Sequence, residues 1–382
     1  MFFSFLIIFM KIALFSDTHL GYARFEADSY VQAERTLVEA SKQADLILCA
    51  GDIFDVKIPK LETLKRAVEI FNRATVPVIA IHGNHERRSR DTVNPVQLLA
   101  ASTNIILLHG QDTVFEKNGQ KIQIFGLGSV PEEYAEEALK RTLERFKPVD
   151  GALKILLIHQ SIKELVAGAG EEELSLEYLE TLPFDLIVNG HIHKTITQLD
   201  GRFIIPGSTV ITQFKKEEME GKGYFLYDTE SRKSEFIPIA SRPFFYEELV
   251  FAEANETQIR EKVRERVEAI KKEKPDALIA IKLEGTLKEG LSGSDISLDA
   301  YENVSIDNRL NVESLGAKLE RIRDLRTESL SIKELALREL ERKTNGKITL
   351  FDSSEIFDKL VEGVDEAIAY LEERNKKETA TK

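Results

Sequence analysis

Six of the seven histidines in this sequence stand at or just beyond the end of an apolar, strand-like run. Aspartate and asparagine accompany them, and the clusters contain, in chain order, Asp17 and His19, Asp52, Asn84 and His85, His159, and His191 and His193. In open α/β sheets the loops beyond the carboxyl ends of the strands form the ligand crevice. One histidine at a strand end is usually structural, whereas five such clusters at successive strand ends favour a single functional site.

The residue types in these clusters predict metal ligation. Asp17 and His19 form a D-x-H pair, and His191 and His193 form an H-x-H pair. Residues two apart at the end of a strand can reach one ion or two adjacent ions. The donors are carboxylate, amide oxygen and imidazole, without thiolate, which suits octahedral manganese or iron better than a structural zinc site.

The elements that must position these residues alternate between short apolar runs and amphipathic helical stretches up to about residue 242, which predicts an α/β fold. Strands are expected at 11–16, 45–50, 76–81, 121–125, 153–158, 185–188, 202–205 and 223–227. The domain that carries the site is therefore placed at 10–242. A smaller α+β capping domain is expected at 243–325, with a strand in PFFYEELVF, a helix at 257–272 and a strand at 277–283. Residues 326–382 are expected to form a helical segment that binds a partner.

Composition excludes several classes of protein. With 42% apolar and 31% charged residues, the chain falls outside the range of disordered proteins. One cysteine, Cys49, cannot close an intrachain disulfide, so a reducing, cytoplasmic location is expected. The net charge of −13 argues against binding nucleic acid by whole-molecule charge, and a DNA contact would need a local basic patch or bound cations.

The first ten residues, MFFSFLIIFM, are apolar but too short to cross a bilayer. They also have neither the basic start nor the cleavage site of a signal peptide. Our preferred interpretation is that residues 1–9 are a start-site extension or disordered and that Met10 is the natural first residue. A peripheral membrane anchor is the alternative.

The five clusters of Asp, Asn and His together resemble the five motifs of the calcineurin-like metallophosphoesterases, in the same order. The resemblance implies a β-sandwich flanked by helices and a centre of two divalent ions. Carried over by position, Asp17, His19 and His193 would hold one ion, and Asn84, His159 and His191 the other, with Asp52 bridging them. His85 would be the histidine that is not a ligand, placed to protonate the leaving oxygen or to steady charge at the scissile phosphate.

Several short sequence segments resemble the Mre-eleven branch of this superfamily, which comprises the archaeal and eukaryotic DNA double-strand-break nucleases and is related to bacterial SbcD. They are KIALFSDTHLGY, GDIFD, GNHERR followed by NPVQLL, and IHQSI. This resemblance implies a Mn²⁺-dependent DNA exonuclease and endonuclease that forms a homodimer. It also implies that the C-terminal helices bind the coiled coil of a Rad-fifty-like ATPase.

Two positions depart from that branch. Glu86 stands where these nucleases usually carry Asp, and its side chain could orient His85 or stabilise its charged form. Asp55 stands where some of them carry a histidine beside the substrate, which leaves the balance of exonuclease and endonuclease activity open. The sequence assigns no role to His82.

Several alternatives stay open at this point. The same centre would serve a phosphatase or a small-molecule phosphodiesterase, and a vestigial centre would suit a non-catalytic scaffold that binds DNA ends. Arg87, Arg88 and Arg90 are either DNA-backbone contacts or a solvated loop. The last predicted helix carries an apolar stripe that packs either on a partner or on its own domain, and the stripe comprises Ile356, Leu360, Val364, Ile368 and Leu371.

Overall fold

The computed structural model describes residues 9–89, 92–166, 173–288 and 291–311, together with residues 355, 359, 368 and 370. The chain divides into two compact units, Met1–Leu310 and Asn311–Lys382. The predicted helices of the tail and the boundary at 325 lie outside the described residues, apart from the four isolated helical positions. The predicted domain boundaries therefore stay predictions.

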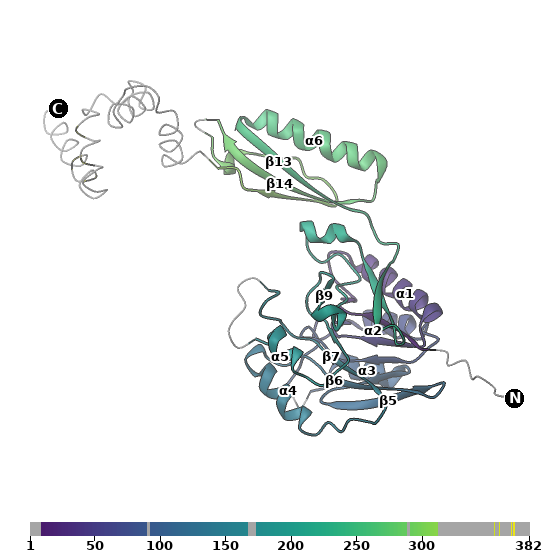
Figure 1. Cartoon of the computed structure of the whole chain (residues 1–382). Helices are drawn as coiled ribbons and strands as arrows, with labels where there is room; N and C mark the ends of the chain where they lie inside the picture. Colours follow the sequence, from purple (N-terminus) through teal and green to yellow (C-terminus); the bar gives the residue numbers. More distant parts are fainter. Residues whose placement is uncertain are drawn as a thin grey trace. The chain divides into compact units, whose positions relative to one another are not determined.

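Two six-stranded sheets form the main body of the first unit (Figure 1). The first sheet has the order β12-β11-β1-β2-β3-β4, and its strands are β1 (Lys11–Phe15), β2 (Leu46–Cys49), β3 (Val78–Ala80), β4 (Ile105–Leu107), β11 (Gly223–Asp228) and β12 (Lys233–Pro238). The second sheet has the order β5-β6-β7-β8-β10-β9, and its strands are β5 (Gln111–Lys117), β6 (Gln120–Leu127), β7 (Leu153–Ile158), β8 (Leu186–Asn189), β9 (Ile196–Gln198) and β10 (Phe203–Ile205). The strands that lead into the predicted site, β1 to β3 and β7 to β8, are parallel to their neighbours within this group.

The two sheets pack face to face around one apolar core. Ile12 and Leu14 of β1 share this core with Ile155 and Leu157 of β7. Side chains alternate across a strand, so Ala13 and Phe15 face the opposite way and pack under helices. Because both faces of the sheet are covered, the strand reads as a continuous apolar run.

Helices cover the outer face of each sheet. The helices over the first sheet are α1 (Glu26–Gln43), α2 (Leu61–Phe71) and α3 (Pro95–Ser102). Those over the second sheet are α4 (Ala135–Leu143) and α5 (Leu176–Glu180). Short 3₁₀ helices are η1 (Glu132–Tyr134), η2 (Leu199–Gly201), η3 (Lys216–Glu220) and η4 (Gly293–Asp295). The predicted β-sandwich flanked by helices is confirmed.

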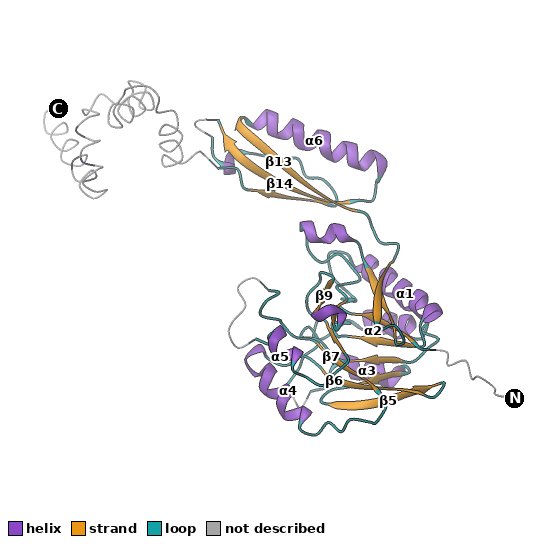
Figure 2. Ribbon diagram, in the orientation of Figure 1, coloured by secondary structure: helices purple, strands orange, loops and turns teal. Residues whose placement is uncertain are grey.

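A third sheet follows residue 243, with strands β13 (Phe244–Ala254), β14 (Leu278–Leu287) and β15 (Val304–Asn308). Helix α6 (Glu256–Glu273) joins β13 to the parallel β14 and lies along this sheet (Figure 2). Asn255 caps α6 by accepting a hydrogen bond from the Gln258 N–H, and Val263 and Val267 are buried with Ile281 of β14. Both predicted strands and the predicted helix of this region are present.

Among the helices in the described part of the chain, none combines the length and apolarity needed to span a bilayer.

Candidate metal centre

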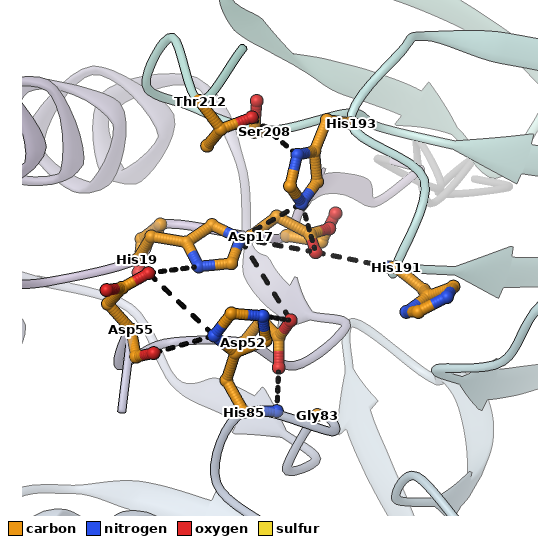
Figure 3. Close-up of polar contacts among 12 residues, drawn as sticks. Asp17, His19, Asp52, Asp55, Gly83, His85, His191, His193, Ser208 and Thr212 are labelled. Carbon is orange, nitrogen blue, oxygen red and sulfur yellow. Dashed lines mark hydrogen bonds and ion pairs between the residues drawn. The ribbon is translucent and has the colours of Figure 1, made fainter. Parts of the chain in front are cut away.

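The predicted site residues all lie just beyond the carboxyl ends of five strands. Asp17 and His19 follow β1, Asp52 follows β2, and Asn84 and His85 follow β3. The second sheet supplies His159 after β7 and the pair His191 and His193 after β8. Because these strands end at one edge of the sandwich, clusters far apart in the sequence meet there (Figure 3).

One group of donors consists of Asp17, His19 and His193. The Nε2 atoms of His19 and His193 lie 3.1 Å apart, and Asp17 Oδ1 is 3.9 and 3.8 Å from them. Asp17 is fully buried, and its Oδ2 atom has no hydrogen-bond partner among the described residues. A bound cation would pair with these two imidazole nitrogens and with the buried carboxylate oxygen that has no hydrogen bond.

A second group consists of Asn84, His159 and His191. Asn84 Oδ1 lies 3.0 Å from His159 Nε2 and 2.8 Å from His191 Nδ1. Asp52 stands between the two groups, because its Oδ2 atom is 3.4 Å from His159 Nε2 and 4.0 Å from His19 Nε2. The structure thus brings together all seven residues predicted as ligands, with the carboxylate predicted to bridge in the middle.

His85 lies at the exposed side of this cluster. Its side chain is 37% exposed, and its Nε2 atom is 3.9 Å from Asp52 Oδ2. Its Nδ1 atom lies 2.6 Å from the backbone carbonyl of Asp55, which fixes the ring. His19, Asp52 and His85 are also close enough to one another to share an ion. The ligand set and the role of His85 as a non-ligand stay predictions.

Several non-glycine residues around the site have positive φ angles, which residues with a side chain rarely adopt. Asp17, His19, Asp52 and His191 have φ values of 54°, 44°, 49° and 78°. Such left-handed positions cost free energy for non-glycine residues and concentrate at functional sites. Gly83 is required for a different reason, because a Cβ atom there would lie 1.9 Å from Asp52 Oδ1.

Contacts behind the donors set the orientation of the imidazole rings. Asp55 Oδ1 is 3.3 Å from His19 Nδ1, the Ala50 carbonyl is 2.6 Å from His159 Nδ1, and the Thr212 hydroxyl is 2.5 Å from His193 Nδ1. Nδ1 of His159 and Nδ1 of His193 are thus hydrogen-bonded, Nδ1 of His19 is close to a carboxylate without a hydrogen bond, and Nε2 of each ring faces the cluster. Sequence reasoning did not find Thr212, and it noted Asp55 only as a departure.

Glu86 has a different role from the one suggested by the sequence. It is fully buried, and its two carboxylate oxygens accept hydrogen bonds of 2.6 Å from the backbone N–H groups of Phe54 and Gly83. The side chain therefore ties the loop after β2 to the loop after β3. The suggestion that it orients the His85 ring is wrong, because both oxygens are directed at backbone.

Electrostatics favour neutral imidazole donors at two positions. Burial, together with the charge of His159, lowers the pKa of His191 to about 4, and burial with the nearby His19 lowers the pKa of His193 to about 2. Burial also opposes charge on His159, but the Asp52 carboxylate outweighs it and raises the pKa of His159 to about 10. Burial alone would raise the pKa of Asp52, but the same attraction holds that pKa far below its usual range, so Asp52 is a carboxylate at neutral pH.

The donor set fits two divalent cations. Nitrogen and oxygen donors without thiolate suit ions such as manganese or iron. Asp17 and Asp52 are buried together, and bound cations would balance the negative charge that the charged His159 ring otherwise balances.

Comparison with known proteins identifies the family of one domain. Residues 10–195 match the calcineurin-like phosphoesterase family. The DNA double-strand break repair protein Mre11 of Sulfurisphaera tokodaii is 33% identical over 234 residues, which are 57% of this chain and 59% of that protein. Mre11 of Methanocaldococcus jannaschii is 26% identical over 334 residues, or 81% of this chain and 88% of that protein. The SbcD component of nuclease SbcCD from Staphylococcus epidermidis is 24% identical over 263 residues, covering 60% of this chain and 70% of that protein.

The chain thus spans about three fifths of the Sulfurisphaera tokodaii relative. The matched residues 10–195 contain both donor groups, Asp52 and His85. Residues 10–195 thus form a calcineurin-like metallophosphoesterase domain, and the chain is similar to Mre11 and SbcD proteins.

Proposed function

We propose that this chain is a two-metal nuclease that hydrolyses phosphodiester bonds at DNA ends in double-strand-break repair. The observation that carries the proposal is the meeting of seven nitrogen and oxygen donors from five strand ends, with a partly exposed histidine beside them. The names of its relatives, DNA double-strand break repair protein Mre11 and the SbcD component of nuclease SbcCD, support DNA as the substrate.

Asp17, His19 and His193 would hold one ion, Asn84, His159 and His191 the other, and Asp52 both. Two divalent ions bound there supply the positive charge that draws in a phosphodiester and makes a water molecule nucleophilic. Mn²⁺ is the ion that we propose, because hard carboxylate and amide oxygens accompany the imidazoles.

His85 would donate the proton that the leaving oxygen takes up. The Asp55 carbonyl accepts from His85 Nδ1, so the ring is anchored with Nε2 directed toward Asp52 and the cluster. Its partial exposure lets the ring meet a large substrate, whereas His159 and Asp17 are fully buried and can only bind or orient. General acid help of this kind typically contributes ~10²–10⁴-fold.

DNA would approach along the loop that follows His85. Arg87 and the exposed Arg88 lie there, while Arg90 is outside the described residues. Arg88 donates to the Val93 carbonyl at 3.0 Å and Arg87 to Ser129 at 3.4 Å, so neither guanidinium is neutralised by a carboxylate in these contacts. With a net charge of −13, such local cations and bound metal ions must provide the attraction for phosphate.

A Rad-fifty-like ATPase is the proposed partner, bound through the C-terminal helices of a homodimer. The name of the Staphylococcus epidermidis relative, which is one component of SbcCD, supports assembly with another chain. Deleting residues 326–382, or combining Leu360→Asp with Val364→Asp, should abolish the complex in pull-down experiments and leave manganese-dependent cleavage by the isolated chain nearly unchanged. Undiminished ATPase binding, or misfolding of the truncated chain, would favour packing of the tail on its own domain.

The test of the function compares substrates with and without Mn²⁺. Single-stranded DNA, duplex ends and bis-p-nitrophenyl phosphate should all be cleaved, and p-nitrophenyl phosphate should be the poorest substrate. Monoester hydrolysis far above any DNA cleavage would establish the rival phosphatase. DNA-end binding without hydrolysis of any substrate would establish the scaffold.

A further inference from the structure

A buried ion pair lies beside the metal centre and takes no part in the chemistry proposed above. Glu218 of η3 is 6% exposed, and Lys222, just before β11, is 4% exposed. Removing two charges from water is costly, and a buried ion pair is often no more stabilising than apolar residues of the same volume. Stability alone is therefore a weak reason for this pair.

The pair holds one loop at two points. Glu218 Oε1 accepts hydrogen bonds from the backbone N–H groups of Thr212 and Gln213, both at 3.2 Å. Lys222 Nζ donates to Ser208 Oγ at 2.8 Å. Ser208 and Thr212 belong to the segment that follows β10, so the two charges fix the start and the end of the same loop.

This loop reaches the first group of metal donors. The Thr212 hydroxyl is 2.5 Å from His193 Nδ1, and the Ser208 N–H donates to the His193 carbonyl at 3.1 Å (Figure 3). The Tyr22 hydroxyl holds the loop from the other side by donating to the Thr212 carbonyl at 2.8 Å. A shift of this loop would turn the His193 ring.

These contacts allow one hydrogen-bond polarity that would set the tautomer of His193. A carboxylate paired with an ammonium group is an acceptor only, so the Thr212 hydroxyl can donate its one hydrogen to Glu218 Oε1, which lies 3.5 Å away. The hydroxyl oxygen then accepts from His193 Nδ1–H. That leaves the lone pair of His193 on Nε2, the atom facing His19 and Asp17.

We propose that the Glu218–Lys222 pair is a positioning device that, through Thr212, sets the orientation and the tautomer of the His193 metal ligand. The proposal rests on the divalent-metal site of the proposed function. Partners of this kind commonly change metal affinity by ~10–100-fold when they are removed. Glu218 and Lys222 touch neither substrate nor ion and act only through the loop.

The test measures binding of Mn²⁺ alone to the full chain by calorimetry, together with thermal unfolding of the metal-free protein. Thr212→Val removes the hydroxyl at nearly constant volume and should weaken one of the two ions by ~10–100-fold while the other keeps its wild-type affinity. Thr212→Ser should restore wild-type binding. The double variant Glu218→Gln/Lys222→Met avoids an unpaired buried charge and should weaken the same ion as Thr212→Val.

A matched control removes the same charges from an exposed pair in the same region. Lys194 and Glu220 lie 3.4 Å apart with side chains 44% and 48% exposed. Lys194→Met/Glu220→Gln should leave both Mn²⁺ affinities unchanged.

Three results would overturn the proposal. These are wild-type affinity for both ions in Thr212→Val, equal weakening of both ions in proportion to a lower melting temperature, and failure of serine to restore binding. Binding of two Mn²⁺ ions by a wild-type chain that cleaves no phosphodiester would contradict the proposed function alone.

Discussion

Asp55 contacts His19 through its carboxylate and His85 mainly through its backbone carbonyl. Replacing Asp55 by alanine should therefore separate the roles of the two histidines. Its carboxylate Oδ1 lies 3.3 Å from His19 Nδ1 and 3.8 Å from His85 Nδ1, while its backbone carbonyl lies 2.6 Å from His85 Nδ1. Asp55→Ala removes the carboxylate and keeps the carbonyl. His19 therefore loses its orienting partner, whereas His85 keeps its shortest contact.

The expected magnitudes follow from these contacts. Loss of the partner of a ligand histidine typically weakens metal binding by ~10–100-fold, which is about 1.4 to 2.8 kcal/mol. We expect this loss at the ion held by Asp17, His19 and His193 and wild-type affinity at the other. At saturating Mn²⁺ the kcat for bis-p-nitrophenyl phosphate should return close to the wild-type value, because His85 remains anchored.

His85→Ala provides the opposite pattern. Both ions should bind with wild-type affinity, while kcat at saturating Mn²⁺ should fall by ~10²–10⁴-fold because general acid help is lost. The assay is a Mn²⁺ titration by calorimetry, paired with kcat measured over a range of Mn²⁺ concentrations. Loss of an ion in His85→Ala would make His85 a ligand. A kcat in Asp55→Ala as low as that of His85→Ala would refute the anchoring role of the carbonyl.

The remaining predictions concern the bridging residue, metal removal and acid stability. Asp52→Ala should abolish turnover and weaken the binding of both ions, because the Asp52 carboxylate lies between His19 and His159. Asp17→Ala should weaken the binding of mainly one ion. Full occupancy of two ions in Asp52→Ala would refute the bridging assignment. Adding Mn²⁺ at 100 times its dissociation constant to chelator-treated protein should raise the unfolding free energy by about 2.7 kcal/mol per ion, and an unchanged melting temperature would argue against binding to the folded chain. Burial and the neighbouring His109 lower the pKa of His82 to about 4 from an ordinary value of 6.5. Between pH 6.5 and pH 4 the unfolded chain therefore binds a proton on His82, whereas the folded chain does not. The contribution of His82 to the free energy of unfolding is fully present above pH 6.5, and this free energy falls by about 3 kcal/mol as the pH drops to 4. Urea unfolding of His82→Gln should show a correspondingly smaller loss between pH 7 and 4, and identical losses in both proteins would rule out His82 as the cause.

The sandwich core and the location of the site could be predicted because both leave local signals. Strand β1 is buried on both faces, so it reads as a continuous apolar run, and Asp17 follows directly where the strand ends. Strand β5 could not be found in this way. Most of its residues are exposed at the edge of its sheet, and its sequence, QDTVFEK, is largely polar.

The groups that orient the ligands could not be predicted, because their contacts depend on tertiary structure. Thr212 meets His193 from 19 residues away, and Glu218 and Lys222 read as part of a charged surface segment, KKEEMEGK, although both are buried. The Glu86 carboxylate reaches Phe54, 32 residues distant, so its adjacency to His85 along the chain suggested the wrong partner. Local sequence reasoning places donors, whereas the packing of loops decides what holds them.

The most direct test of the two-metal centre is a crystal structure of the chain grown with Mn²⁺, with anomalous scattering recorded at the manganese edge. Two anomalous peaks are expected about 3.5–4 Å apart. Asp52 should contact both, Asp17, His19 and His193 one, and Asn84, His159 and His191 the other, with His85 bound to neither. A single peak, or a peak ligated by His85 in place of His193, would contradict the two-metal centre on which the proposed function depends.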